Sequence, residues 1–184
     1  MKLLAGLAVL AAAALVAQTP QPTDLDGHRV DPFQAPDARA VVLLFVRSDC
    51  PISNRYAPEI RRIHDRFAGH GVVFWLVYPD AQESAAEIRR HVAEYRYPGR
   101  VLQDPGHVLV KLARAEVTPE AAVFAPGRRL VYHGRIDDLY VDWGRTRPAP
   151  TTHDLAAAIE ATLASRPVPA AATRAVGCFL ADLH

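Results

Sequence analysis

Two apolar runs without a polar residue stand out in the first half of the chain, at residues 41–46 and 72–77. Such runs, rich in β-branched side chains, are typical of strands buried on both faces of a sheet. Between them, apolar residues recur at helical spacing and predict an amphipathic helix that begins at Pro51. Its apolar face consists of Tyr56, Ile60, Ile63 and Phe67. The pattern therefore predicts a strand, a tight turn, a helix and a second central strand.

The middle of the chain continues this alternation of strand and helix. One apolar side over residues 81–95 predicts a second helix. Asp104 is expected to cap a short helix over residues 106–113, with Val108 and Leu112 facing inward.

The last third of the chain is predicted to contain a hairpin, a helix and an extended tail. Residues 121–134 are predicted to form an antiparallel strand and a hairpin, and a final helix is predicted over residues 153–165. Thr151 and Asp154 have the spacing of a capping box for that helix. Residues 166–184 contain two prolines and no periodicity, which indicates an extended tail on the surface. The whole order predicts an α/β fold, with a central mixed β-sheet flanked by helices on both faces.

The N-terminus has the pattern of a secretory signal. A basic residue precedes an apolar run at residues 3–14, and Ala14 and Ala17 are candidate cleavage positions, so we predict a signal peptide over residues 1–17. The run is too short for a stable membrane span after cleavage. These features predict a periplasmic or secreted protein with one domain over residues 20–165 and a tail, residues 166–184, that carries Cys178.

The charge of the chain narrows the class of partner. Its formal net charge is +1, which gives no indication of nucleic acid as a partner. It contains two cysteines, and in an oxidising compartment two cysteines are free to pair. The oligomeric state is not indicated by the sequence.

Cys50 lies directly before the first predicted helix, in the turn that follows the first predicted strand. At a helix N-terminus a sulfur faces unpaired main-chain N–H groups and the positive end of the helix dipole, which favour the thiolate. The neighbouring Asp49 disfavours a second negative charge, whereas Arg47 and Arg55 offset it. Either an inert core thiol or a reactive nucleophile fits this position, and we favour the nucleophile.

Cys178 lies far along the sequence, in the tail beyond the last helix. The residues between that helix and Cys178 can span about 40 Å when extended, enough to cross a domain of this size. Three hypotheses remain open. Cys178 is the resolving thiol for Cys50, or it forms a structural disulfide with Cys50 worth about 4–5 kcal/mol in the chain-entropy model, or it is unpaired or intermolecular.

The segment Cys50-Pro51-Ile52-Ser53 resembles the Cys-x-x-Cys site of the thioredoxin superfamily, with serine in place of the second cysteine. Pro58 matches the proline inside the first helix of that superfamily. Thr118-Pro119, just before the predicted antiparallel strand, resembles its cis-proline motif. The resemblance implies a thioredoxin-like three-layer sandwich in which the cis-proline lies against the active-site sulfur.

Longer motifs are similar to those of exported redoxin-domain proteins of the alkyl hydroperoxide reductase/thiol-specific antioxidant group. They are Asp49-Cys50-Pro51-Ile52-Ser53, Tyr56-Ala57-Pro58-Glu59, Ile136-Asp137-Asp138 and Gly177-Cys178. This resemblance implies that Cys50 and Cys178 both belong to the redox machinery and that Thr118 and Pro119 position the substrate.

Thiol–disulfide exchange is the preferred chemistry, with a protein or a small-molecule thiol or disulfide as partner. A peroxiredoxin-like antioxidant is the first alternative, but its motif needs proline and threonine where this chain has Leu43 and Arg47. A non-catalytic scaffold with a permanent Cys50–Cys178 disulfide is the second. Ser53 cannot resolve a mixed disulfide; its hydroxyl either donates to the Cys50 thiolate or bonds its own main chain.

A metal site is the remaining class of function. Cys50 and Cys178 would need to converge with His107, His133 or His153 to bind a soft metal ion. Because the chain has no Cys-x-x-x-Cys motif and its histidines are scattered singly, we predict no metal site and no cofactor.

Overall fold

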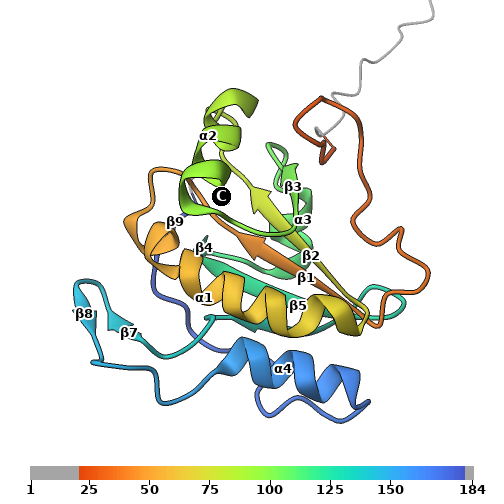
Figure 1. Cartoon of the computed structure of the whole chain (residues 1–184), viewed down its shortest axis with the longest axis vertical. Helices are drawn as coiled ribbons and strands as arrows, with labels where there is room; N and C mark the ends of the chain where they lie inside the picture. Colours follow the sequence, from red (N-terminus) through yellow and green to blue (C-terminus); the bar gives the residue numbers. More distant parts are fainter. Residues whose placement is uncertain (1–20, 181–184) are drawn as a thin grey trace, which may run out of the picture.

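The computed structural model describes residues 21–180. The predicted signal peptide and the last four residues lie outside the described residues. The centre of the molecule is a five-stranded sheet in the order β3-β2-β1-β5-β6 (Figure 1). Its strands are β1 (Ala40–Phe45), β2 (Val72–Tyr78), β3 (Arg100–Gln103), β5 (Glu120–Ala125) and β6 (Arg129–Gly134). The first three strands run parallel, whereas β5 and β6 are antiparallel to their neighbours, so the sheet is mixed as predicted.

Helices cover both faces of this sheet. The helices are α1 (Pro51–Phe67), α2 (Ala85–Tyr95), α3 (Val108–Ala113) and α4 (Asp154–Leu163), and the 3-10 turn η1 (Ala68–His70) follows α1. The side chains of β1 alternate between two separate apolar clusters, one shared with α1, α2 and α4 and the other with α3. Figure 1 shows α1 and α4 on the same face of the sheet. This is the predicted three-layer sandwich.

Two small sheets lie outside the central one. One pairs β4 (Val117–Thr118) with β9 (Cys178–Phe179), and the other pairs β7 (Tyr140–Asp142) with β8 (Arg145–Thr146). The tail reaches β9 as an extended segment, and on the way Ala172 forms a bridge with His133 of β6. No helix within residues 21–180 has both the length and the apolar character of a membrane-crossing segment.

The first strand and the first helix match the sequence prediction closely. Helix α1 begins at Pro51, with Cys50 as its extended N-cap residue. All four residues of the predicted apolar face are buried. The reason is local, because proline is favoured in the first helical turn and the helical period sets the buried side.

The starts of α2 and α3 and the cap of α4 differ from the prediction. Helix α2 begins after Ser84, not at residue 81, because Ser84 and Glu87 form a reciprocal capping box. Asp104 does accept hydrogen bonds from the first N–H groups of α3, but that helix buries Leu109 and leaves Leu112 42% exposed.

The predicted Thr151–Asp154 capping box at α4 is wrong. His153 is the N-cap residue there, without a side-chain cap. The Thr151 hydroxyl donates to Asp138, and Asp154 instead accepts from Arg135 and from the Thr152 hydroxyl. The Thr151 hydroxyl and the Asp154 carboxylate therefore do not form the predicted capping box. Each instead bonds to a residue distant in sequence, Asp138 and Arg135 respectively.

Candidate functional site

The first element of the site is Cys50 at the N-terminus of α1. Its backbone is extended (φ −88°, ψ 109°), and its main-chain N–H donates to Arg47 while its carbonyl accepts from Asn54. The apolar strand β1 is thus followed by a tight turn, which places the Cys50 sulfur at the first turn of α1. The free N–H groups of that turn provide a positive environment for a thiolate.

Cys50 forms a disulfide with Cys178, and their Cα atoms are 6.1 Å apart although the two residues are separated by 128 positions. Strand β9 carries Cys178 to this place. Both cysteines of the chain are therefore paired within one molecule, which contradicts the hypothesis that Cys178 is unpaired or intermolecular.

The Cys50 sulfur is inaccessible to solvent in this disulfide form. Cys50 is 0% exposed, and it packs in the same apolar cluster as α1 and α4. The tail covers it from outside, and Cys178 is only half-buried. An attacking thiol therefore meets Cys178 first.

The Thr118–Pro119 peptide bond is cis, as the resemblance implied. The Cys50 sulfur lies 3.0 Å from the main-chain oxygen of Thr118, so the cis-proline segment contacts the sulfur at the start of α1. Strand β4 pairs antiparallel with β9, with Val117 opposite Phe179 and Thr118 opposite Cys178. The main chain before the cis-proline therefore holds the cysteine of the tail.

Two buried hydroxyl groups beside the disulfide have no hydrogen-bond partner within the described part of the chain. They are Ser53 Oγ and Thr118 Oγ1. Within the described residues the Ser53 hydroxyl donates to neither predicted partner, the Cys50 sulfur or its own main chain. The Ser53 carbonyl accepts from the Tyr97 hydroxyl. A buried hydroxyl without a partner costs about 1–3 kcal/mol, so such groups call for an explanation.

The charges before Cys50 are organised around Arg47. Its guanidinium lies 2.8 Å from Asp49 and 3.1 Å from Asp80. The Asp49 carboxylate, which would oppose a thiolate at Cys50, is therefore paired with a cation.

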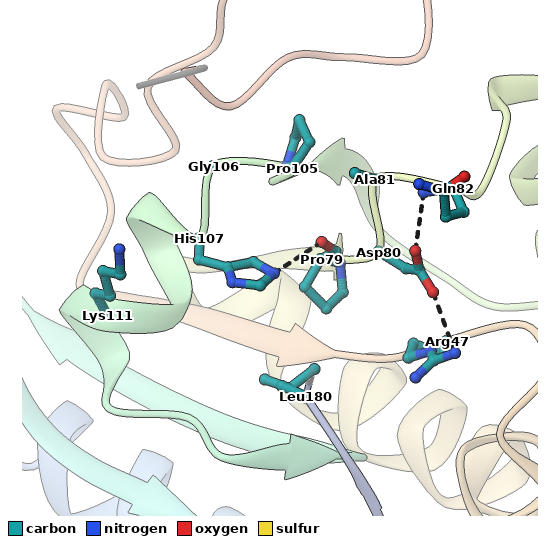
Figure 2. A pocket seen from close by; sticks show the side chains of 10 residues that line it. All are labelled: Arg47, Pro79, Asp80, Ala81, Gln82, Pro105, Gly106, His107, Lys111 and Leu180. Carbon is teal, nitrogen blue, oxygen red and sulfur yellow. Dashed lines mark hydrogen bonds and ion pairs between the residues drawn. The ribbon is translucent and has the colours of Figure 1, made fainter. Parts of the chain in front are cut away.

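A pocket of about 250 Å³ opens next to this ion pair. Asp80 links Arg47 to the main-chain N–H of Gln82, and His107 donates to the Pro79 carbonyl (Figure 2). Leu180 of the tail lines the same pocket. The pocket thus lies between the segment that precedes one cysteine and the segment that follows the other.

A buried acid, Glu120, follows the cis-proline and was missed by the sequence analysis. Its carboxylate accepts from the main-chain N–H groups of Glu116 and Val117 at 2.8 and 3.3 Å, and His133 Nδ1 lies 3.6 Å away. Burial raises the pKa of Glu120 above its usual range, although these donors oppose the shift. The carboxylate supports β4, which pairs with the tail. A charged residue at the start of an otherwise apolar strand was the available signal.

The histidines considered for a soft-metal site do not gather at the sulfurs. His107 contacts Pro79, His133 faces Glu120, and His153 lies 4.0 Å from Glu59.

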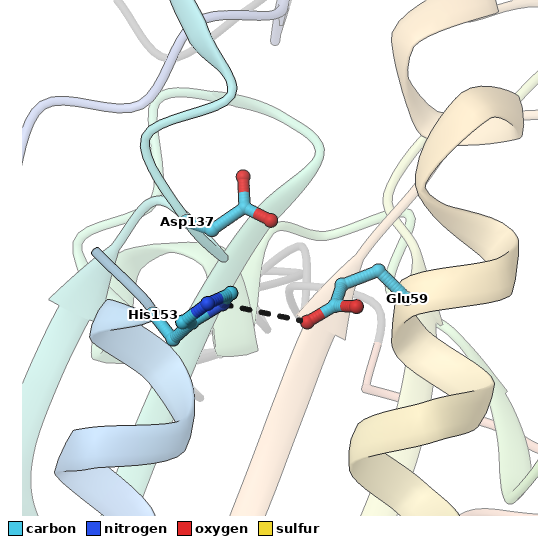
Figure 3. Close-up of side chains that lie close together, drawn as sticks. All are labelled: Glu59, Asp137 and His153. Atoms are coloured by element: carbon cyan, nitrogen blue, oxygen red, sulfur yellow. Dashed lines mark ion pairs between the residues drawn. The ribbon is translucent and has the colours of Figure 1, made fainter. Parts of the chain in front are cut away.

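Elsewhere the described residues contain a different group of possible ligands, in which atoms of Glu59, Asp137 and His153 lie within 4.8 Å of one another (Figure 3). Both oxygens of Glu59 already accept from Arg62, and Asp137 accepts from the Tyr56 hydroxyl at 2.6 Å. The hydrogen bond between Tyr56 and Asp137 connects two of the sequence motifs named above, residues 56–59 and residues 136–138.

Comparison with solved structures supports the fold. An uncharacterized conserved protein from Geobacillus kaustophilus is 24% identical, with a TM-score of 0.72 over 89% of this chain and 92% of that chain. A hypothetical protein from Sinorhizobium meliloti is 26% identical, with a TM-score of 0.72 over 85% of this chain and 86% of that chain. A secreted disulfide oxidoreductase of Mycobacterium tuberculosis is 18% identical, with a TM-score of 0.51 over 80% of this chain and 96% of that chain.

No curated protein matches the sequence. The model of the AhpC/TSA family matches residues 12–133, which include Cys50, the cis-proline and the strands β1 to β5. With the thioredoxin-like sheet and the disulfide at the start of α1, the chain belongs to the AhpC/TSA family of redoxins.

Proposed function

We propose that the protein is an exported thiol–disulfide oxidoreductase that uses Cys50 as its nucleophile and Cys178 as the resolving thiol. One observation carries the proposal: a tail cysteine 128 positions away is bonded to the sulfur at the start of α1, beside the cis Thr118–Pro119 bond. Cys178 takes the place of the second cysteine that Ser53 replaces. The signal pattern at residues 1–17 supports export, and the similar Mycobacterium tuberculosis protein is described as secreted.

Reduction of the oxidised protein begins at Cys178 in this proposal. An external thiolate attacks the sulfur of Cys178, because Cys50 is 0% exposed. The Cys50–Cys178 bond breaks, a mixed disulfide forms on Cys178, and Cys50 leaves as a thiolate. The N–H groups at the start of α1 stabilise that leaving group, which accelerates exchange. A second external thiol then releases Cys178.

The reduced protein transfers its two electrons to a partner disulfide. The Cys50 thiolate attacks one sulfur of the partner, and the other partner sulfur leaves as a thiolate. Cys178 then attacks Cys50, which re-forms the intramolecular disulfide and releases the second partner thiol. The unpartnered hydroxyls of Ser53 and Thr118 have a role in this cycle as donors to the Cys50 thiolate. Ser53 lies one helical turn from Cys50, where an N-cap side chain and the third helical residue meet.

Peroxide reduction is the second candidate, favoured by membership of the AhpC/TSA family. The positions that would hold peroxide in the expected motif are Leu43, which is buried in the core, and Arg47, whose guanidinium is paired with Asp49 and Asp80. These contacts favour disulfide over peroxide as the electron acceptor.

Trapping the first intermediate tests the proposed mechanism. Oxidised protein is treated briefly with glutathione, alkylated and mapped by mass spectrometry, with Cys50→Ser and Cys178→Ser as controls. We expect the glutathione adduct on Cys178 and the alkyl group on Cys50. A bond that resists glutathione entirely supports the scaffold instead. Parallel assays of insulin reduction and of peroxide consumption by the wild-type protein and both variants separate exchange from peroxidase activity.

Export is tested separately. We expect the mature protein recovered from outside the cytoplasm to begin after residue 14 or 17, as measured by N-terminal mass mapping, whereas retention of residues 1–17 on a cytoplasmic protein contradicts export.

A further inference from the structure

The tail occupies the main-chain edge beside the cis-proline as an added strand. β9 pairs with β4, and the Leu180 N–H donates to the Glu116 carbonyl at 3.0 Å. An extended segment that lies along an exposed strand edge gains main-chain hydrogen bonds, while its side chains enter pockets that select among sequences. β9 thus shows, residue by residue, which segment this edge accepts.

The residue before the cysteine must be glycine at this edge. A Cβ atom built on Gly177 would lie 2.2 Å from the main-chain oxygen of Thr118 and 2.6 Å from its carbonyl carbon. Both atoms are main chain next to a cis peptide bond, so they cannot rotate away as a side chain would. Every residue other than glycine therefore pushes the segment off the strand edge.

The two residues after the cysteine meet different surroundings. Phe179 is 81% exposed, and Trp143 on the rim of the adjacent pocket is 62% exposed. Leu180, by contrast, is only 7% exposed, and it packs in the apolar cluster of α3. The edge is therefore permissive directly after the cysteine and selects an apolar side chain one residue later.

We propose that, in the reduced protein, this edge binds an extended segment of a partner protein with the sequence pattern Gly-Cys-x-apolar, in the place that β9 vacates. The inference rests on the proposed exchange activity and names its substrate class. The segment's cysteine is disulfide-bonded, and its sulfur lies where Cys178 lies in the oxidised form. The Cys50 thiolate attacks it, the segment's former disulfide partner leaves as a thiolate, and Cys178 then closes on Cys50 and releases the segment as a thiol.

Synthetic peptides with the sequence of residues 175–180 test this pattern. The peptide cysteine carries a thionitrobenzoate group, whose release on attack by Cys50 is followed by absorbance. Reduced full-length protein is mixed with the Gly-Cys-Phe-Leu peptide and with three single variants, in which Ala replaces Gly, Ser replaces Phe or Ser replaces Leu. We expect the Ala peptide to react about 5- to 150-fold more slowly, since overpacking of this size costs about 1–3 kcal/mol. The Ser-for-Leu peptide is also slower, and the Ser-for-Phe peptide reacts at the rate of the parent.

Equal rates for the Gly and Ala peptides overturn the inference. The small disulfide dithionitrobenzoate, which has no peptide, reports on the proposed function alone. If the wild-type protein reduces it and Cys50→Ser does not, exchange activity stands while the peptide pattern fails. If the wild-type protein reacts with no disulfide, both proposals are wrong. A covalent dimer through Cys50 and Cys178, formed in preference to peptide adducts on non-reducing gels, overturns the partner segment in favour of a second copy of this chain.

Discussion

The sulfur of Cys50 lies 3.0 Å from the main-chain oxygen of Thr118. A disulfide sulfur carries no proton, so this is a contact in the oxidised form, and a reduced Cys50 thiol can donate to the same oxygen. The same carbonyl limits the space at Gly177. One peptide group therefore contacts the Cys50 sulfur and limits how the tail that carries Cys178 packs.

The disulfide is expected to be a large part of the stability of the chain. It closes a loop of 128 positions, and the chain-entropy model gives about 4–5 kcal/mol for a loop of that order. Guanidinium unfolding of the oxidised protein, the reduced protein, Cys50→Ser and Cys178→Ser measures the difference. We expect the last three to agree closely and to fall below the oxidised protein. Equal stability of the oxidised and reduced proteins contradicts this expectation.

Gly177→Ala is expected to weaken the disulfide without removing a sulfur. The added methyl group meets the Thr118 carbonyl, and a cost of about 1–3 kcal/mol to the oxidised form raises the reduction potential by about 20–60 mV. Equilibration with glutathione redox buffers gives the potential. Gly69→Ala is the matched control, because a Cβ there meets nothing within 4 Å. A potential unchanged in Gly177→Ala would falsify the close approach.

Removal of the two unpartnered hydroxyls is expected to affect the reduced form more than the oxidised form. Ser53→Ala and Thr118→Val remove groups that have no hydrogen-bond partner among residues 21–180 in the disulfide state, so the unfolding free energy of the oxidised protein should be unchanged or slightly higher. If the hydroxyls donate to the Cys50 thiolate, the variants lower the reduction potential and slow alkylation of Cys50 by iodoacetamide. Wild-type values for both measurements mean that the hydroxyls have no role in exchange.

Asp137 and Asp138 are neighbours whose pKa values shift in opposite directions. Burial raises the pKa of Asp137, and the nearby Glu59 adds to the shift. Asp138 is also desolvated, but hydrogen bonds from the Thr151 hydroxyl and from main-chain N–H groups, with Arg147 adjacent, hold its pKa well below the usual range. The two carboxylates should therefore give stability opposite dependences on pH.

The signs follow from linkage. Ionised Asp137 is less favourable in the folded state, so the wild-type protein loses stability from this group as pH rises above about 4. Asp137→Asn keeps an acceptor for Tyr56 and lacks that loss, so its unfolding free energy relative to wild type should increase between pH 4 and 8. Asp138 contributes stability above about pH 4, so Asp138→Asn should be most damaging at neutral pH and less so near pH 3. Urea unfolding across this range measures both; parallel curves for the two variants contradict the assignment.

Local patterns determined much of this protein. The apolar run of β1 and the proline that begins α1 act through neighbours in sequence, so the strand and the helix start were predictable. The cis Thr118–Pro119 bond was implied by the resemblance to the thioredoxin superfamily. The capping box that was predicted wrongly at α4 shows the limit of this reasoning. Thr151 gives its hydroxyl to Asp138, a choice that only the folded chain presents.

The sequence by itself therefore determined the fold class, the place of Cys50 at the start of a helix and the presence of a second cysteine in an extended tail. Only the tertiary structure decided that Cys178 reaches Cys50, that the Cys50 sulfur is buried, and that two hydroxyls beside the disulfide have no hydrogen-bond partner within residues 21–180. The physical reason is distance along the chain. A tail that can extend about 40 Å can reach many surfaces of the domain. It lies beside Thr118 because Gly177 fits closely against the Thr118 main chain. No local sequence pattern encodes that fit.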